Sequence, residues 1–146
     1  MLLACDCRLG VDGDYKIGLN EVAIGVSFPK AAFEIVRLRL THQRASELLL
    51  DAGLYSATEA LRLGVVDELI AARSFEETVL LRAARLGSYP KDAFAHTKAA
   101  LVDEAVERVK AEPSDEARRG AALWMTPESV SARLAQTEKL GKRTAH

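Results

Sequence analysis

The sequence of 146 residues contains few cysteines, few aromatic residues and no excess of either charge. Its 20 basic and 21 acidic residues give a net charge of −1, and aromatic residues make up only 5% of the chain. A nucleic-acid-binding surface needs clustered cations, often interleaved with aromatic side chains. The composition therefore does not indicate that the protein binds DNA or RNA.

Long apolar runs are also missing. Charged residues interrupt every run well before the roughly 18 apolar residues that a membrane-spanning helix needs. The apolar start at residues 1–5 is followed at once by Asp6 and Arg8, unlike the basic leader and longer apolar core of a secretory signal peptide. We therefore expect a cytoplasmic protein with no membrane partner.

The cysteines and histidines do not form a metal-binding pattern. Cys5 and Cys7 would lie on the same face of a strand, and no second pair exists to complete a site with four ligands. Such a pair is most often buried packing. His42, His96 and His146 have no acidic residues or cysteines at a ligand spacing that would make a metal triad, so we expect them at the surface or core edge. No metal and no redox cofactor is expected.

Nucleotide-binding and hydrolase motifs are absent as well. The chain has no GxGxxG, GxxxxGK[ST], HExxH or GxSxG sequence, and no repeat of 20–50 residues. Its content of 49% hydrophobic and 28% charged residues is enough for the core of one ordinary domain. We expect a soluble globular unit.

The first half of the chain contains short strands followed by helices. Residues 1–11 form an apolar run of strand length, and residues 15–19 form a second short strand. From Lys30 onward apolar residues recur three and four apart, which predicts helix. The sequence from Ser56 to Glu59 is a capping box that opens a short helix, and residues 65–70 return to strand.

The second half predicts helices only. Ser74 and Glu77 form another capping box, and Gly87 can end the helix that it opens. Pro90 suits a first helical position, and no breaker follows until Pro113, so this stretch predicts the longest helix. A further helix should follow Pro113.

The last helix should begin with Thr126 as its cap and Pro127 in its first turn. Just before it, Trp124 is expected in the core, or with lower preference at a subunit interface, because large aromatic side chains are buried on average.

Glu21 stands out in the largely apolar stretch GLNEVAIGVSFPKAAFE, residues 18–34, as the only carboxylate before the final residue Glu34. Most loop carboxylates are solvated charges without chemistry, which is the simpler interpretation. Alternatively, Leu19 and the apolar residues 22–24 partly desolvate it, which suits a carboxyl group to moving protons at neutral pH. The residues alone leave both interpretations open.

A series of motifs in residues 1–70 resembles the crotonase (enoyl-CoA hydratase/isomerase) family. LLACD, GLNE, Pro29, RASELLLDAG and ATEALRLGVV match that family's ALACD, GLPE or GLNE, G-x-x-P, RAxELLLTG and AxEAxxxGLV, in the same order. The resemblance implies an α/β, crotonase-like (ClpP/crotonase) fold, truncated, with a few short strands followed by a mainly helical C-terminal region. Residues 1–70 would form the second half of the α/β core, and residues 71–146 a helical oligomerisation region.

The same resemblance implies a function. The glutamate of the GLPE/GLNE motif is the acid/base of these enzymes, so Glu21 takes that role, with Leu19, Asn20, Pro29 and Lys30 as substrate-binding residues. The substrate would be a coenzyme A thioester of fatty acid or acyl-CoA metabolism, with no separate cofactor, and the protein a homotrimer or hexamer. Asn20, where many hydratases have proline, is similar to the one-glutamate Δ3,Δ2-enoyl-CoA isomerases.

Other parts of the family's site belong to segments upstream of the matched motifs, namely a second glutamate and two donors to the substrate oxygen. We therefore expect the chain to correspond to the C-terminal half of a crotonase. Hydratase, isomerase and other thioester chemistries stay open, and the alternative is a non-catalytic remnant that acts only through subunit contacts. Lys139, Lys142 and Arg143 are candidates for binding the coenzyme A phosphates, although cations at a helix end usually just stabilise the helix dipole.

Overall fold

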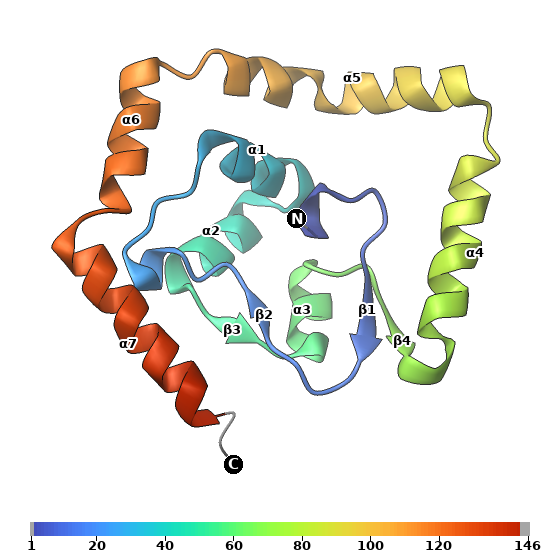
Figure 1. Ribbon diagram of the computed structural model, residues 1–146. Coiled ribbons are helices and arrows are strands. Elements are labelled where there is room, and N and C mark those ends of the chain that lie inside the picture. The colour runs from blue at the N-terminus through green and yellow to red at the C-terminus, as the bar shows by residue number, and fades with distance from the viewer. Residues whose placement is uncertain (1, 144–146) are drawn as a thin grey trace.

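An α/β part near the N-terminus is bordered on three sides by a succession of helices (Figure 1). The computed structural model describes residues 2–143, and side chains as far as residue 139. Residues 2–71 contain all the strands and three α-helices of the described chain, and the helices α4 to α7 follow one another around the outside. The expected order of short strands followed by a mainly helical region is confirmed.

Four short strands pair in two separate sheets. Strand β1 (Leu9–Asp12) runs parallel to β4 (Glu68–Ala71), with Leu9 opposite Glu68. Strand β2 (Ile17–Gly18) runs antiparallel to β3 (Leu54–Tyr55). The strands predicted for residues 15–19 and 65–70 are therefore confirmed, although each is shorter than predicted.

The single strand predicted for residues 1–11 is wrong. Leu2–Ala4 form the 3-10 helix η1, and pairing starts only around Arg8. There the backbone N–H and Nε of Arg8 donate to Asp67 Oδ2 at 2.9 and 3.2 Å, and the N–H of Asp67 donates to the Arg8 carbonyl at 2.7 Å. Strand β4 offers only four residues to pair, and no other strand of the described residues pairs with the apolar segment before Arg8.

The expectation that Cys5 and Cys7 are buried on one strand face is wrong for the same reason. Both precede β1, and Cys5 is exposed while Cys7 is half-buried. Of the histidines, His42 and His96 are exposed, as expected, and His146 lies outside the described residues.

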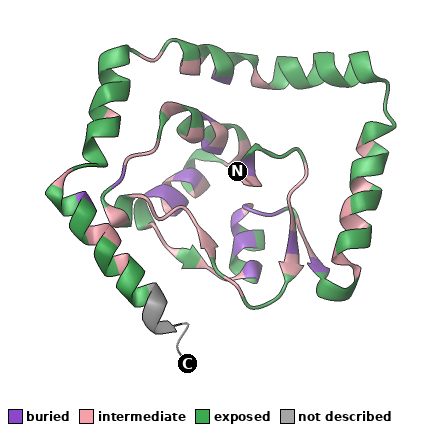
Figure 2. Ribbon diagram, in the orientation of Figure 1, coloured by how far each residue is buried: buried purple, intermediate pink, exposed green. Residues whose placement is uncertain are grey.

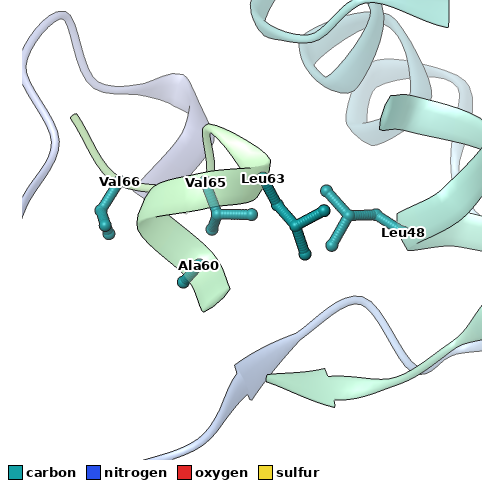
Figure 3. Close-up of a cluster of buried hydrophobic side chains, with 5 residues drawn as sticks. All are labelled: Leu48, Ala60, Leu63, Val65 and Val66. Carbon is teal, nitrogen blue, oxygen red and sulfur yellow. The ribbon is translucent and has the colours of Figure 1, made fainter. Parts of the chain in front are cut away.

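Three helices supply the core, and the third of them packs on the strands of both sheets. Their bounds are α1 (Lys30–Arg39), α2 (His42–Asp51) and α3 (Ala57–Leu63). In Figure 3, Leu48 of α2 points toward Leu63 of α3, in one cluster with Ala60, Val65 and Val66. A second cluster joins η1 with α1 and α2 and consists of Leu3, Val36, Ala45 and Leu49. The helical spacing from Lys30 onward is therefore confirmed.

Only one of the two predicted capping boxes forms. Ser56 Oγ accepts from the N–H of Glu59 at 3.4 Å, and the Glu59 carboxylate accepts from the N–H of Ser56 at 2.8 Å. Ser74 instead ends the 3-10 helix η3 (Ala72–Ser74), and its hydroxyl donates to the Ala71 carbonyl at 3.2 Å. Its φ of −114° and ψ of 4° differ from the extended conformation of a capping residue.

The C-terminal helices are α4 (Phe75–Gly87), α5 (Lys91–Lys110), α6 (Ser114–Leu123) and α7 (Pro127–Arg143). Helix α5 is the longest, as predicted, and Pro90 precedes it as the cap instead of opening its first turn. Figure 2 shows that these helices are mostly exposed. Trp124 is 42% exposed, so its expected place in the core is wrong.

Helix α5 is anchored on α1 by charge and by apolar contact. The carboxylate of Glu34, only 1% exposed, accepts from Arg108 Nε at 2.7 Å. It also lies 3.4 Å from Arg37 Nη1 and 3.6 Å from Lys30 Nζ. A groove of about 320 Å³ separates the two helices, with mainly apolar walls that include Ile35, Leu38, Val102, Val106 and Val109.

Replacing Arg108 with methionine should leave the buried Glu34 carboxylate without its best partner. We expect a loss of about 2–3 kcal/mol in the free energy of unfolding, measured by urea titration, because Arg37 and Lys30 compensate only in part. Arg119→Met is the control, since Arg119 pairs with Asp115 on an exposed helix face and should cost less than about 0.5 kcal/mol. Equal losses in both variants would contradict the anchoring role.

Glu34 should also make stability depend on pH. The hydrogen bond from Arg108 holds the pKa of Glu34 below its usual value although burial acts in the opposite direction. The stabilisation is therefore present above the unfolded-state pKa of about 4.3 and is lost as pH falls through the lower folded-state pKa. The difference in unfolding free energy between wild type and Glu34→Gln should be largest at neutral pH and shrink below about pH 4. A difference that grows on acidification would refute this assignment.

Candidate functional site

Glu21 lies at the start of a tight turn that leads from β2 to α1. It precedes the 3-10 helix η2 (Val22–Ile24), and its carbonyl accepts from the N–H of Ile24 at 3.1 Å and of Val26 at 2.8 Å. Gly25 ends the turn with a φ of +70°, a conformation that a residue without a side chain adopts at low cost. The two hydrogen bonds from Ile24 and Val26 thus fix the backbone carbonyl of Glu21.

The carboxylate of Glu21 is half-buried and has one unsatisfied oxygen. Its Oε2 atom is shielded from solvent and has no hydrogen-bond partner among the described residues. Buried polar atoms are normally paired, since an unpaired one costs free energy, and exceptions concentrate where a site does chemistry. One oxygen of Glu21 is therefore desolvated, although Val22 and Ala23, two of the apolar neighbours expected to shield it, are themselves exposed.

The C-terminal helices hold the segment that follows Glu21. Ser27 Oγ donates to the Gly120 carbonyl of α6 at 3.0 Å. The hydroxyl of Ser129 on α7 donates to the Gly25 carbonyl, and Ser129 is only 1% exposed. A contact across about a hundred residues of sequence thus fixes the turn beside the candidate acid/base.

Two of the predicted substrate-binding residues precede Glu21. The half-buried Leu19 packs against both apolar clusters of the core, which gives it a structural role. Asn20 is half-buried between Leu19 and Glu21. Their contact with a substrate stays a prediction.

The other two predicted substrate-binding residues share a cavity. Pro29 caps α1 and Lys30 opens it, and both line a cavity of about 300 Å³ with Phe28 and with Trp124 of the C-terminal region. A larger groove of about 850 Å³ lies on the other side of Phe28 and includes Val22, the residue next to Glu21. Glu21 itself is in the wall of neither hollow.

The cations proposed for coenzyme A phosphates are only partly described. Lys139 is exposed on α7, and the side chains of Lys142 and Arg143 lie outside the described residues. Among the residues described, no group of three or more histidine, cysteine or acidic side chains could hold a metal ion. Within the same residues, no helix is both long enough and apolar enough to cross a membrane.

Sequence reasoning missed the residues that support the site. The start of the last helix has an ordinary sequence, which does not single out Ser129. Only Gly25 could have been noticed locally, because it is a glycine in a turn. On the same helix, one turn beyond Ser129, Arg133 has a buried Nη1 atom with no hydrogen-bond partner among the described residues. Glu21 and Arg133 thus carry the two unpaired buried polar atoms of the described side chains.

Comparison with known proteins identifies the family. The family model for enoyl-CoA hydratase/isomerase matches residues 1–135. The chain therefore belongs to the enoyl-CoA hydratase/isomerase family, a family of enzymes, as the motifs in residues 1–70 indicated.

Individual relatives agree with this assignment. The chain is similar to human mitochondrial enoyl-CoA delta isomerase 1, with 34% identity over 101 residues that cover 68% of this chain and 33% of the relative. It thus spans about a third of that relative's length.

Two crystal structures show the same fold. Human mitochondrial Δ3-Δ2-enoyl-CoA isomerase matches with a TM-score of 0.84 over 97% of this chain and 55% of that one, at 24% identity, which shows the fold alone. An enoyl-CoA hydratase from Mycobacterium avium subsp. paratuberculosis K-10 matches with a TM-score of 0.77 and 29% identity, over 93% of this chain and 56% of that one. The expected crotonase-like α/β fold is confirmed.

Gly25→Ala should test how tightly α7 packs on the turn. A Cβ at Gly25 would lie 2.9 Å from Ser129 Cα, and the positive φ adds strain. We expect a loss of about 2–4 kcal/mol in unfolding free energy. Gly64→Ala is the matched control, because Gly64 has a φ of +78° but its Cβ would lie 3.5 Å from the nearest atom. It should cost only about 1–2 kcal/mol, and equal costs would argue against close packing of α7.

Proposed function

We propose that Glu21 is the acid/base residue of an isomerase-type reaction on an unsaturated acyl-CoA thioester. The observation that carries the proposal is the buried Oε2 atom of Glu21, which has no partner among the described residues and lies in a turn closed by two hydrogen bonds to the Glu21 carbonyl. Family membership supports it, as does the GLNE motif. The similarity to a human enoyl-CoA delta isomerase favours isomerisation over hydration.

A single carboxylate is sufficient for this chemistry. The Glu21 carboxylate removes a proton from the α-carbon of a β,γ-unsaturated thioester, and the electron pair of the broken C–H bond moves into a dienolate. The resulting carboxylic acid then returns the proton to the γ-carbon, which leaves the double bond between the α and β carbons and restores the carboxylate. No oxidant and no water is consumed, so the reaction needs no second glutamate and no cofactor.

The proposal concerns the native protein, because an enolate oxygen also needs hydrogen-bond donors close to it. We further propose that the native protein lies in the cytoplasm and assembles as a homotrimer or hexamer. Large apolar side chains that are exposed on α6, on α7 and in the turn between them support self-association, namely Leu123, Met125, Val130 and Leu134.

Glu21→Gln should abolish most of the isomerase activity. Because a positioned acid/base typically accelerates a reaction by about 10²–10⁴-fold, we expect kcat to fall by that factor with little change in KM. The measurement follows formation of the conjugated thioester by absorbance, with a β,γ-unsaturated hexenoyl-CoA as substrate. Deuterium uptake at the α-carbon in D2O, read by mass spectrometry, reports the first proton transfer by itself.

The control is Glu77→Gln, which changes an exposed glutamate in the first turn of α4. It should leave both rates unchanged. Each variant is introduced into the source gene, so that the protein is purified with whatever chains accompany it. An active wild type that tolerates Glu21→Gln would rule out the proposed role. A wild type with neither isomerisation nor deuterium uptake would favour the non-catalytic remnant.

A further inference from the structure

Ser129 is the most deeply buried polar residue of the outer helices. It is 1% exposed on α7, a helix whose other described residues are exposed or half-buried. Its hydroxyl has two acceptors within reach, the carbonyls of Gly25 and Leu123. A hydroxyl has one proton and can serve only one carbonyl at a time. The Leu123 carbonyl also accepts from Thr126 Oγ1 at 3.2 Å, which leaves the Ser129 proton for Gly25.

Helix capping does not explain this arrangement. Thr126 already caps α7, because its Oγ1 accepts from the N–H of Ser129 at 3.2 Å. Ser129 occupies the third helical position, where a capping box would place a glutamate or glutamine that reaches back to the cap. The shorter serine instead reaches the turn that follows Glu21. The helix start therefore leaves its hydroxyl available for a contact elsewhere.

The contact bears on Glu21 through the backbone. Gly25 lies directly before Val26, whose N–H donates to the Glu21 carbonyl at 2.8 Å, and after Ile24, which donates to the same carbonyl at 3.1 Å. The Oε2 atom of Glu21 has no side-chain tether among the described residues. The direction of the carboxylate therefore depends on the backbone of this turn.

We propose that Ser129 is a positioning residue for Glu21: it holds the carbonyl of Gly25 and thereby sets where the Glu21 carboxylate points. The inference rests on the proposed function of Glu21. In this proposal α7 contributes to catalysis although none of its residues contacts the reacting atoms. Ser27, whose hydroxyl donates to Gly120 of α6, holds the next part of the segment and should act in the same direction.

The first measurement is backbone amide exchange by NMR in wild type and Ser129→Ala. The N–H groups of Val26 and Ile24 report directly on their hydrogen bonds to Glu21, and we expect them to exchange about tenfold faster in the variant. The N–H of Ala60, which donates to the Ser56 carbonyl at 2.9 Å in the core, should be unaffected. Unchanged exchange at Val26 would overturn the proposal whether or not the protein is active.

The second measurement is a double-mutant cycle on the isomerase rate. Misplacement of a reacting group by about 1 Å can cost about 10²-fold. Ser129→Ala should therefore lower kcat by about 10–100-fold with KM unchanged, and it should have no further effect in a Glu21→Gln background. An equal loss in both backgrounds would show that Ser129 does not act through Glu21.

Two controls separate positioning from general stability. Thr137→Ala removes another hydroxyl from α7, one that donates to the Arg133 carbonyl at 3.0 Å and lies on an exposed face. Ser56→Ala removes the capping box of α3 and so lowers stability away from the turn. Both should leave kcat and the Val26 exchange unchanged. If Glu21→Gln has no effect on the rate, the proposed function fails, while the amide exchange still decides whether Ser129 holds the turn.

Discussion

The buried carboxylate of Glu34 joins the helical part of the molecule to its α/β part. One of its oxygens accepts from Arg108 of α5, and the other faces Arg37 and Lys30 of α1. A carboxylate at this depth would be costly without cations around it, so the sequence of α1 requires α5 to lie where it does. The exposed Asp6 adds a second ionic link between the same two helices by pairing with Lys98 of α5 and Arg39 of α1. The apolar residues between these two ion-pair groups then pack in a fixed register.

The position of α5 determines what the last two helices can reach. Helices α6 and α7 follow α5 around the molecule and return to the turn after Glu21 (Figure 1). There Ser27 donates to Gly120 of α6, and Ser129 of α7 donates to Gly25. The ion pair between Glu34 and Arg108 thus helps to place the helices that contact the candidate site.

Local signals in the sequence were more reliable than those that depend on a distant partner, although the capping box at Ser74 failed. The capping box at Ser56 could be predicted because all its atoms lie within one turn, as could the helical spacing from Lys30. Residues 1–11 have the composition of a strand, but β4 pairs with only four residues, which composition cannot reveal. Ser74 has the right neighbours for a capping box and the wrong backbone angles, because the chain leaves β4 through a 3-10 helix.

The residues of the candidate site also differ in whether their signal is local or depends on a distant partner. Glu21 could be found from one motif, because the motif is contiguous. The contact of Ser129 with Gly25 spans 104 positions, and its local signs are slight. They are a glycine in a turn and a serine at a helical position where a capping box has a longer acidic or amide side chain.

Two glutamates thirteen positions apart receive opposite surroundings in this fold. Glu34 is held as a carboxylate by three cations, which stabilises the structure and makes it unsuited to exchanging protons. Glu21 has a shielded oxygen that no described group pairs with, which costs stability. A protein selected only for stability would pair or expose the second carboxylate as it pairs the first. The difference between the two is what an acid/base role for Glu21 requires.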